Sequence, residues 1–265
     1  MMQPEPKVGL ALGGGAFRGL AHIGVLQVFN EAKIPVHLVS GCSMGALIGG
    51  LYCSGMDMRL IERYVYTLDE RSLADVILPR QGLLGGARIE NILRTLTGNK
   101  SFAQMKIPFS ALAVDIERGE LTTLTEGPVW QAIRASISIP GVFRPLRLGD
   151  RLLVDGGVLC RVPTDAARAM GADFIISVDV GYHGGFVPCD GLSAIIMQAF
   201  AVMEWALIKE KIITSDINIA PDLLHINMVS IAQAAECVEI GRKAALEALP
   251  AIQEGIAKKR ELPGA

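Results

Sequence analysis

Residues 36–52 of this chain read VHLVSGCSMGALIGGLY. Two apolar runs flank the pattern G-x-S-x-G, and they predict a strand over 36–40 and a helix over 44–55. A serine on so sharp a turn projects from the backbone, with its hydroxyl at a helix N-terminus whose N–H groups favour an anion. The same spacing also occurs in ordinary loops, but the strand-to-helix context favours Ser43 as a nucleophile. The residues that would support this elbow are Gly41, Met44 and Gly45.

Strand and helix patterns alternate through the rest of the chain. The predicted strands are 8–12, 36–40, 109–117, 121–124, 152–154, 174–180 and 224–227. The predicted helices are 17–33, 44–55, 128–136, 163–170, 192–213 and 231–258. Apolar strands joined by helical crossovers are typical of an α/β fold with a mostly parallel sheet. We expect residues 1–265 to form one domain, with residues 57–105 as the best candidate for a cap-like insertion.

Composition narrows the classes of function. A net charge of -2 over 265 residues and a pI near 6.1 argue against a nucleic-acid partner, which usually requires a basic excess. The five cysteines are scattered and form no C-x-x-C pair, so we expect neither a disulfide framework nor a zinc site. The N-terminus lacks the pattern of a signal peptide, and these observations together predict a cytoplasmic protein.

The hydropathy of the chain is high. Hydrophobic residues make up 51%, aromatic residues only 5%, and the mean hydropathy is +0.39. A large aliphatic core accounts for part of this value. An apolar substrate or a face that touches a membrane is the more specific explanation of the high mean hydropathy. The strongest candidate for a membrane span, residues 192–208, is short and carries Gln198 and Glu204, so we interpret it as a buried or half-buried helix.

Residues 13–19, GGGAFRG, predict a glycine-rich turn between the first strand and the first helix. They do not match the dinucleotide pattern G-x-G-x-x-G in register, and no acidic residue follows a second strand at the expected distance. They are not a P-loop either, because no G-K-[ST] follows. With an elbow serine downstream, backbone N–H groups here are better suited to an oxyanion hole. Arg18 would orient this loop, meet a substrate phosphate or form a surface ion pair.

A serine nucleophile needs a base, and the chain has four histidines. His22 and His37 fall in a predicted helix and strand, where a structural role is expected. His183 and His225 satisfy the order Ser…Asp…His of a hydrolase triad. Asp155 competes with them, because it ends a predicted strand before two glycines, and a carboxylate within reach can take a serine proton directly. An aspartate before two glycines is also a common turn residue, so these residues alone leave the base open.

Three motifs occur in a fixed order. Residues 8–26 read VGLALGGGAFRGLAHIGVL, residues 41–46 read GCSMGA, and Asp155 opens D-G-G before a proline-led helix and a strand. Residues 135–143, ASISIPGVF, lie between the second and third motifs. Together these segments resemble the bacterial patatin-like phospholipases: their opening, their nucleophile elbow and their D-G-[AG] motif. The resemblance is strong over about residues 8–180 and looser beyond.

This resemblance implies a three-layer α/β/α sandwich around a mostly parallel sheet. It also implies a Ser–Asp dyad, with Ser43 as nucleophile and Asp155 as its base, so that no histidine is required. The loop residues Gly13, Gly14 and Gly15 would then donate the oxyanion-hole hydrogen bonds. The residues that complete the matched motifs are Arg18, Gly19, Gly156 and Gly157. The chain departs from the family at Ala16, where a fourth glycine is common, and at Cys42, where threonine is frequent.

The predicted function is hydrolysis of phospholipid, lysophospholipid or related fatty-acyl esters, with no metal or organic cofactor and no nucleic acid. The high mean hydropathy motivates the hypothesis of transient contact with the inner face of the membrane, while the oligomeric state is left unassigned. Two alternatives stay open: an acyltransferase that uses the same dyad, and a catalytically silent lipid- or nucleotide-binding regulator.

Overall fold

The computed structural model describes residues 5–68, 84, 86–210 and 214–261, and over these residues eight strands form one sheet. The strands are β1 (Val8–Leu12), β2 (Leu38–Cys42), β3 (Phe109–Asp115), β4 (Glu120–Leu124), β5 (Leu146–Leu148), β6 (Arg151–Asp155), β7 (Phe174–Val178) and β8 (Ile217–Ile219). Their order is β5-β6-β3-β2-β1-β7-β8, and β4 also pairs with β3. The pairings among β3, β2, β1, β7 and β8 are parallel, whereas β4, β5 and β6 join in antiparallel fashion.

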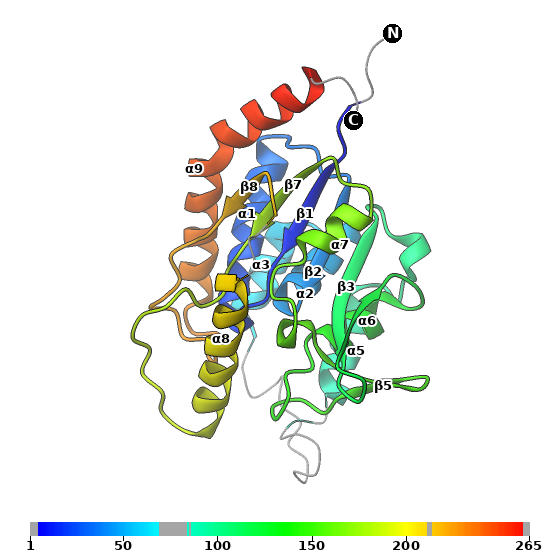
Figure 1. Ribbon diagram of the computed structural model, residues 1–265, viewed down its shortest axis with the longest axis vertical. Coiled ribbons are helices and arrows are strands. Elements are labelled where there is room, and N and C mark those ends of the chain that lie inside the picture. Colours follow the sequence, from blue (N-terminus) through cyan, green and yellow to red (C-terminus); the bar gives the residue numbers. More distant parts are fainter. Residues whose placement is uncertain (1–4, 69–83, 85, 211–213, 262–265) are drawn as a thin grey trace.

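Helices cover both faces of this sheet (Figure 1). The α-helices of the described residues are α1 (Ala21–Glu31), α2 (Met44–Cys53), α3 (Met58–Tyr66), α5 (Ala87–Leu96), α6 (Val129–Ser136), α7 (Thr164–Ala169), α8 (Leu192–Glu210) and α9 (Ala234–Glu261). The short 3-10 helices are η1 (Ala16–Leu20), η2 (Phe102–Gln104) and η3 (Gly156–Val158).

The side chains of β1 alternate between two cores. Leu10 and Leu12 belong to the main hydrophobic cluster, which also holds Ile23 of α1 and Val238 of α9. Ala11 points to the other face of the sheet, in a cluster that includes residues of α7. Because a strand buried on both faces must be apolar throughout, β1 appears in the sequence as an unbroken apolar run. The predicted three-layer α/β/α fold with a mostly parallel sheet is therefore confirmed.

The second strand lies two residues later than predicted. It ends at Cys42, directly before the elbow serine. It begins only after His37, because the backbone and the ring of His37 both form hydrogen bonds with Val8. The backbone N–H of His37 donates to Val8 O at 2.8 Å, and its ring Nδ1 accepts from Val8 N at 2.9 Å. His37 thus has the structural role expected for it.

The strand predicted at 224–227 is wrong. These residues form turns, and the strand at this edge of the sheet is β8, residues Ile217–Ile219. Leu223 and Ile226 are both buried, and Ile226 N donates to Leu223 O at 3.0 Å, a three-residue periodicity that belongs to a turn. The apolar residues therefore face the core without any strand pairing.

The predicted insertion at 57–105 includes α3, α5 and η2, and part of it, at 69–83 and 85, lies outside the described residues. α3 contacts α1 and α9, and α5 contacts α6. A cap-like role for this segment stays a prediction.

Candidate active site

Ser43 stands between the end of β2 and the start of α2. Its backbone φ is +51°, a conformation that non-glycine residues rarely adopt and that is enriched at functional sites. Its N–H donates to Ser136 Oγ at 2.9 Å, which fixes the turn against the end of α6. A Cβ added to Gly45 would overlap Leu12 O, so only glycine lets the helix start this close to β1. The close packing of this turn therefore fixes the position of the Ser43 side chain at the start of α2.

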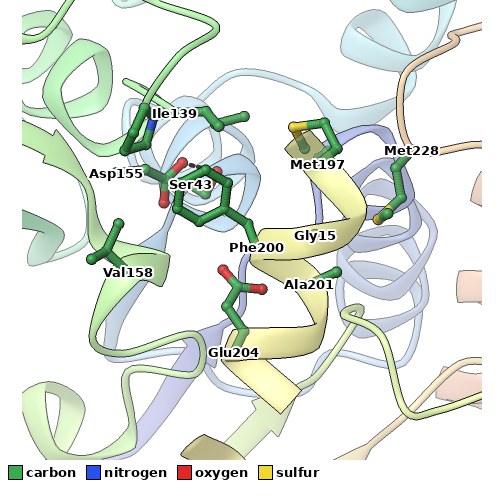
Figure 2. Close-up of a pocket in the computed structure, with 12 residues that line it drawn as sticks. Gly15, Ser43, Ile139, Asp155, Val158, Met197, Phe200, Ala201, Glu204 and Met228 are labelled. Carbon is green, nitrogen blue, oxygen red and sulfur yellow. Dashed lines mark hydrogen bonds between the residues drawn. The ribbon is translucent and has the colours of Figure 1, made fainter. Parts of the chain in front are cut away.

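Asp155 lies opposite, at the end of β6. Ser43 Oγ donates a 2.6 Å hydrogen bond to Asp155 Oδ2, which Figure 2 shows as a dashed line. The other carboxylate oxygen, Oδ1, accepts from Gly157 N at 2.8 Å. Both side chains are enclosed, with Ser43 6% and Asp155 5% exposed. The structure thus brings together the two residues that the motifs singled out.

Burial dominates the electrostatics of this pair. It raises the pKa of Asp155 to about 6, although the hydrogen bonds from Ser43 and Gly157 act in the opposite direction. The neighbouring thiol of Cys42 is fully buried, with Sγ 4.0 Å from Asp155 Oδ1. Burial and then the nearby Asp155 charge raise the pKa of this thiol well above its usual range, so Cys42 stays a neutral thiol rather than a nucleophile.

The glycine loop passes directly over the serine. A Cβ on Gly14 would lie 3.2 Å from Ser43 Cβ. The N–H of Gly13 donates to Val178 O at 2.9 Å, and that of Gly14 to Arg161 O at 3.0 Å, so both amides are engaged within the fold. Gly15 lines the cavity beside Ser43. The next residue, Ala16, has a φ of +49°, a value that favours glycine.

Two buried side chains brace this loop. His22 Nε2 donates to Gly13 O at 2.8 Å, and burial lowers the pKa of the His22 ring to about 4, so the ring is neutral. Arg18 is buried, and its guanidinium donates to the carbonyls of Leu224 and Ile226 at 2.7 and 3.0 Å. Arg18 therefore orients loops and does not form the surface ion pair that was one alternative.

Neither candidate triad histidine bonds to Ser43. His183 Nε2 donates to Asp179 Oδ2 at 3.0 Å, an oxygen that also accepts from Arg161 at 2.8 Å. His225 pairs with Glu236 at 3.0 Å on the exposed side of the molecule. In this structure the acid that meets the serine hydroxyl is Asp155.

Two cavities meet at Ser43. The large cavity, about 530 Å³, is walled almost entirely by aliphatic and aromatic side chains, among them Leu47 of α2, Ile61 of α3 and Leu93 of α5. The small cavity, about 40 Å³, lies on the side of Asp155 and is closed by α8, whose Phe200 and Glu204 line it (Figure 2). The site therefore joins a large apolar cavity to a small one whose polar side chains are Ser43, Asp155 and Glu204.

Comparison with known proteins agrees with this geometry. The family model of patatin-like phospholipases matches residues 10–168, more than half of the chain. The chain belongs to the patatin-like phospholipase family. An uncharacterised NTE family protein of Mycobacterium tuberculosis is 38% identical over 181 residues, which cover 66% of this chain and 49% of that protein. Neuropathy target esterase sws of Drosophila melanogaster is 34% identical over 182 residues, covering 66% of this chain and 13% of that protein.

The fold comparison extends beyond the matched region. The crystal structure of VipD from Legionella pneumophila superposes with a TM-score of 0.67 at 15% identity, covering 94% of this chain and 68% of that one. At this identity the likeness shows a shared patatin-like fold. The chain spans about half the length of the mycobacterial relative, or less for the fly protein.

Among the described residues, no group of three or more His, Cys, Asp or Glu side chains is arranged to hold a metal ion. The site residue that sequence reasoning passed over is Glu204. The available signal was a lone carboxylate inside the apolar run 192–208, where burial makes an unpaired acid costly.

Proposed function

We propose that this patatin-like phospholipase family member is a serine acyl-ester hydrolase of phospholipids, lysophospholipids or related fatty-acyl esters. The observation that carries the proposal is the 2.6 Å hydrogen bond from Ser43 Oγ to Asp155 Oδ2, at the point where the large apolar cavity begins. Family membership supports lipid substrates, since the family model describes phospholipases.

In the proposed reaction Asp155 accepts the proton of Ser43 as Oγ attacks the ester carbonyl carbon. The tetrahedral intermediate collapses as the alcohol leaves with a proton from Asp155, and the acyl group remains on Ser43. Water then attacks the acyl-enzyme, again with Asp155 as proton acceptor, and the fatty acid is released. A base held this close to a nucleophile contributes roughly 10²–10⁴-fold to the rate.

We propose that the oxyanion hole is formed by Gly15 and by the N-terminus of α2. The amides of Gly13 and Gly14 already donate to carbonyl oxygens, which leaves Gly15 as the donor from the expected trio. The N–H of Met44, directly after the nucleophile, lies in the first turn of α2 and is the usual second donor at such elbows. Removal of one such donor costs roughly 3–4 kcal/mol of transition-state stabilisation.

The large cavity is the proposed site of the acyl chain. Its volume of about 530 Å³ lies within the usual range of ligand pockets, and its wall offers an acyl chain almost no polar competitor. Ser43 lines this cavity as well as the small one, so a chain seated in the large cavity would present its ester carbonyl to Oγ.

Labelling with a fluorophosphonate tests this function. We expect Ser43→Ala to abolish labelling and Asp155→Asn to slow it roughly 10²–10⁴-fold, because the hydroxyl loses its base. Cys42→Ala is the matched control, since it changes the adjacent side chain and should label like the wild type. A wild-type protein that does not label would overturn the proposal and favour the silent lipid-binding alternative. Product analysis with an added alcohol acceptor separates hydrolysis from acyl transfer.

We also propose that α8 contacts the membrane surface transiently. No helix among the described residues is both long and apolar enough to cross a bilayer. The outward side of α8 instead exposes Ile195 (55%) and Met203 (62%), and Phe186 just before the helix is 88% exposed. The opposite side of α8 closes the small cavity through Phe200 and Glu204, so the same helix joins a lipid-facing surface to the dyad.

A further inference from the structure

Glu204 of α8 directs a second carboxyl group toward the dyad, as Figure 2 shows. Together with Ser43 and Asp155 it supplies every polar side chain that lines the small cavity. Its Oε1 lies so close to Gly157 that an added Cβ there would overlap it. Gly157 is the residue whose N–H holds Asp155, so Glu204 packs against the support of the catalytic base.

This carboxyl group has no hydrogen-bond partner among the described residues. The pKa of Glu204 is raised to about 8, first by burial and then by the charge of Asp155, with a smaller contribution from Asp179, while Arg161 acts in the opposite direction. At neutral pH Glu204 is therefore protonated, while Asp155, with a pKa of about 6, is ionised. Two neighbouring carboxyl groups held in different protonation states typically have different tasks.

The small cavity has the size of a water site. Its volume of about 40 Å³ is too small for a lipid headgroup, whereas a buried water requires roughly 10–15 Å³ of such space and two to four polar partners. Asp155 and Glu204 both line the cavity and supply two such partners. The acyl chain occupies the other, apolar cavity in the proposed function, so the small cavity stays open to water while the acyl-enzyme exists.

We propose that Glu204 is a positioning residue that holds the water which hydrolyses the acyl-enzyme on Ser43. This inference rests on the proposed function. As the water oxygen bonds to the acyl carbonyl carbon, Asp155 accepts one water proton, and the carbonyl oxygen of neutral Glu204 accepts a hydrogen bond from the other O–H. The bond between the acyl carbon and Ser43 Oγ then breaks, and Asp155 returns the proton to Oγ. Glu204 neither gains nor loses a proton in the step.

The role of Glu204 distinguishes water from other acyl acceptors. A water fixed by two carboxyl groups attacks in preference to a mobile alcohol, so the residue favours hydrolysis over acyl transfer. Loss of Glu204 should slow deacylation by water while leaving the attack of Ser43 on the ester intact, because the base for that attack is Asp155 and Glu204 takes no part in it.

The test is stopped-flow hydrolysis of a soluble p-nitrophenyl fatty-acyl ester, in which the burst reports acylation and the steady phase reports deacylation. We expect Glu204→Met, which removes the oxygen acceptor, to slow deacylation roughly tenfold to hundredfold with an unchanged burst rate. Glu204→Gln keeps a carbonyl oxygen and should deacylate like the wild type. Ala206→Gln, at an exposed position of the same helix, is the matched control.

The burst amplitude counts folded active sites, so a folding defect is visible separately. With an alcohol acceptor added, Glu204→Met should also produce more transesterified product relative to free acid than the wild type does. Deacylation of Glu204→Met at the wild-type rate, or an equal slowing of acylation and deacylation, would overturn the inference alone. Failure of the wild-type protein to release p-nitrophenol at all would overturn the proposed function and this inference together.

Discussion

Asp155 determines the pH dependence expected of the proposed reaction. It acts as a base only when ionised, and burial raises its pKa to about 6. Activity on a soluble ester should therefore fall about tenfold per pH unit below 6 and be level just above it. A series of kcat/KM values from about pH 5 to 9 measures this limb. A limb centred near pH 4, the ordinary value for aspartate, would contradict the enclosed environment of Asp155.

Among individual residues, sequence could predict only the site residues that belong to a local motif. The motifs single out Ser43 and Asp155 because an elbow and a D-G-G turn are local patterns, and in the structure Ser43 Oγ lies 2.6 Å from Asp155 Oδ2. The amide bonding of Gly13 and Gly14 was not predictable, because their acceptors lie at distant positions in the chain. Glu204 was missed for the same reason: its distance from the dyad depends on how α8 packs.

The elbow requires a glycine at position 45, where α2 packs against β1. A Cβ at position 45 would overlap Leu12 O, a backbone atom of the strand that cannot move aside, so Gly45→Ala should destabilise the protein by roughly 1–3 kcal/mol and slow fluorophosphonate labelling. In Gly49→Ala, on the same helix, the Cβ would meet only side-chain ends, of Val39 at 3.1 Å and Leu12 at 3.2 Å. Replacing a helical glycine gains about 1 kcal/mol, so this control should be near neutral. Denaturant midpoints of the two variants compare them, and equal midpoints would contradict the packing argument.

Among the secondary-structure elements, the buried strands and the helices whose first residues are marked by a turn or a proline were predicted well. α2 and α6 lie within a few residues of their predicted positions, because the elbow and Pro128 mark their starts. The segment 224–227 was predicted incorrectly, since alternating apolar residues suit both a strand and a turn that buries Leu223 and Ile226. Here the guanidinium of Arg18 occupies the carbonyls that a neighbouring strand would have paired.

Over the whole molecule, the two cores explain why the fold class followed from sequence. Strands that are apolar on both faces require a helical layer on each side, and the alternation of patterns supplied those layers. The cavities did not follow, because they arise where α3, α5 and α8 leave space around Ser43, and no local pattern encodes a gap. The size and shape of the cavities around Ser43 thus depend on how the helices pack and not on sequence motifs.

The same arrangement predicts how the protein meets a lipid surface. α8 and α9 both expose apolar side chains, but of these two helices only α8 lines the small cavity beside Ser43 and Asp155. Ile195→Gln combined with Met203→Gln should reduce co-sedimentation with phospholipid vesicles and lower activity on them, because two exposed apolar contacts are lost. Activity on a soluble short-chain ester should be retained. Leu246→Gln on α9, at a site 52% exposed, is the matched control and should bind vesicles like the wild type. Equal wild-type activity on soluble esters and vesicles, with no co-sedimentation, would contradict the membrane contact and leave the dyad chemistry untouched.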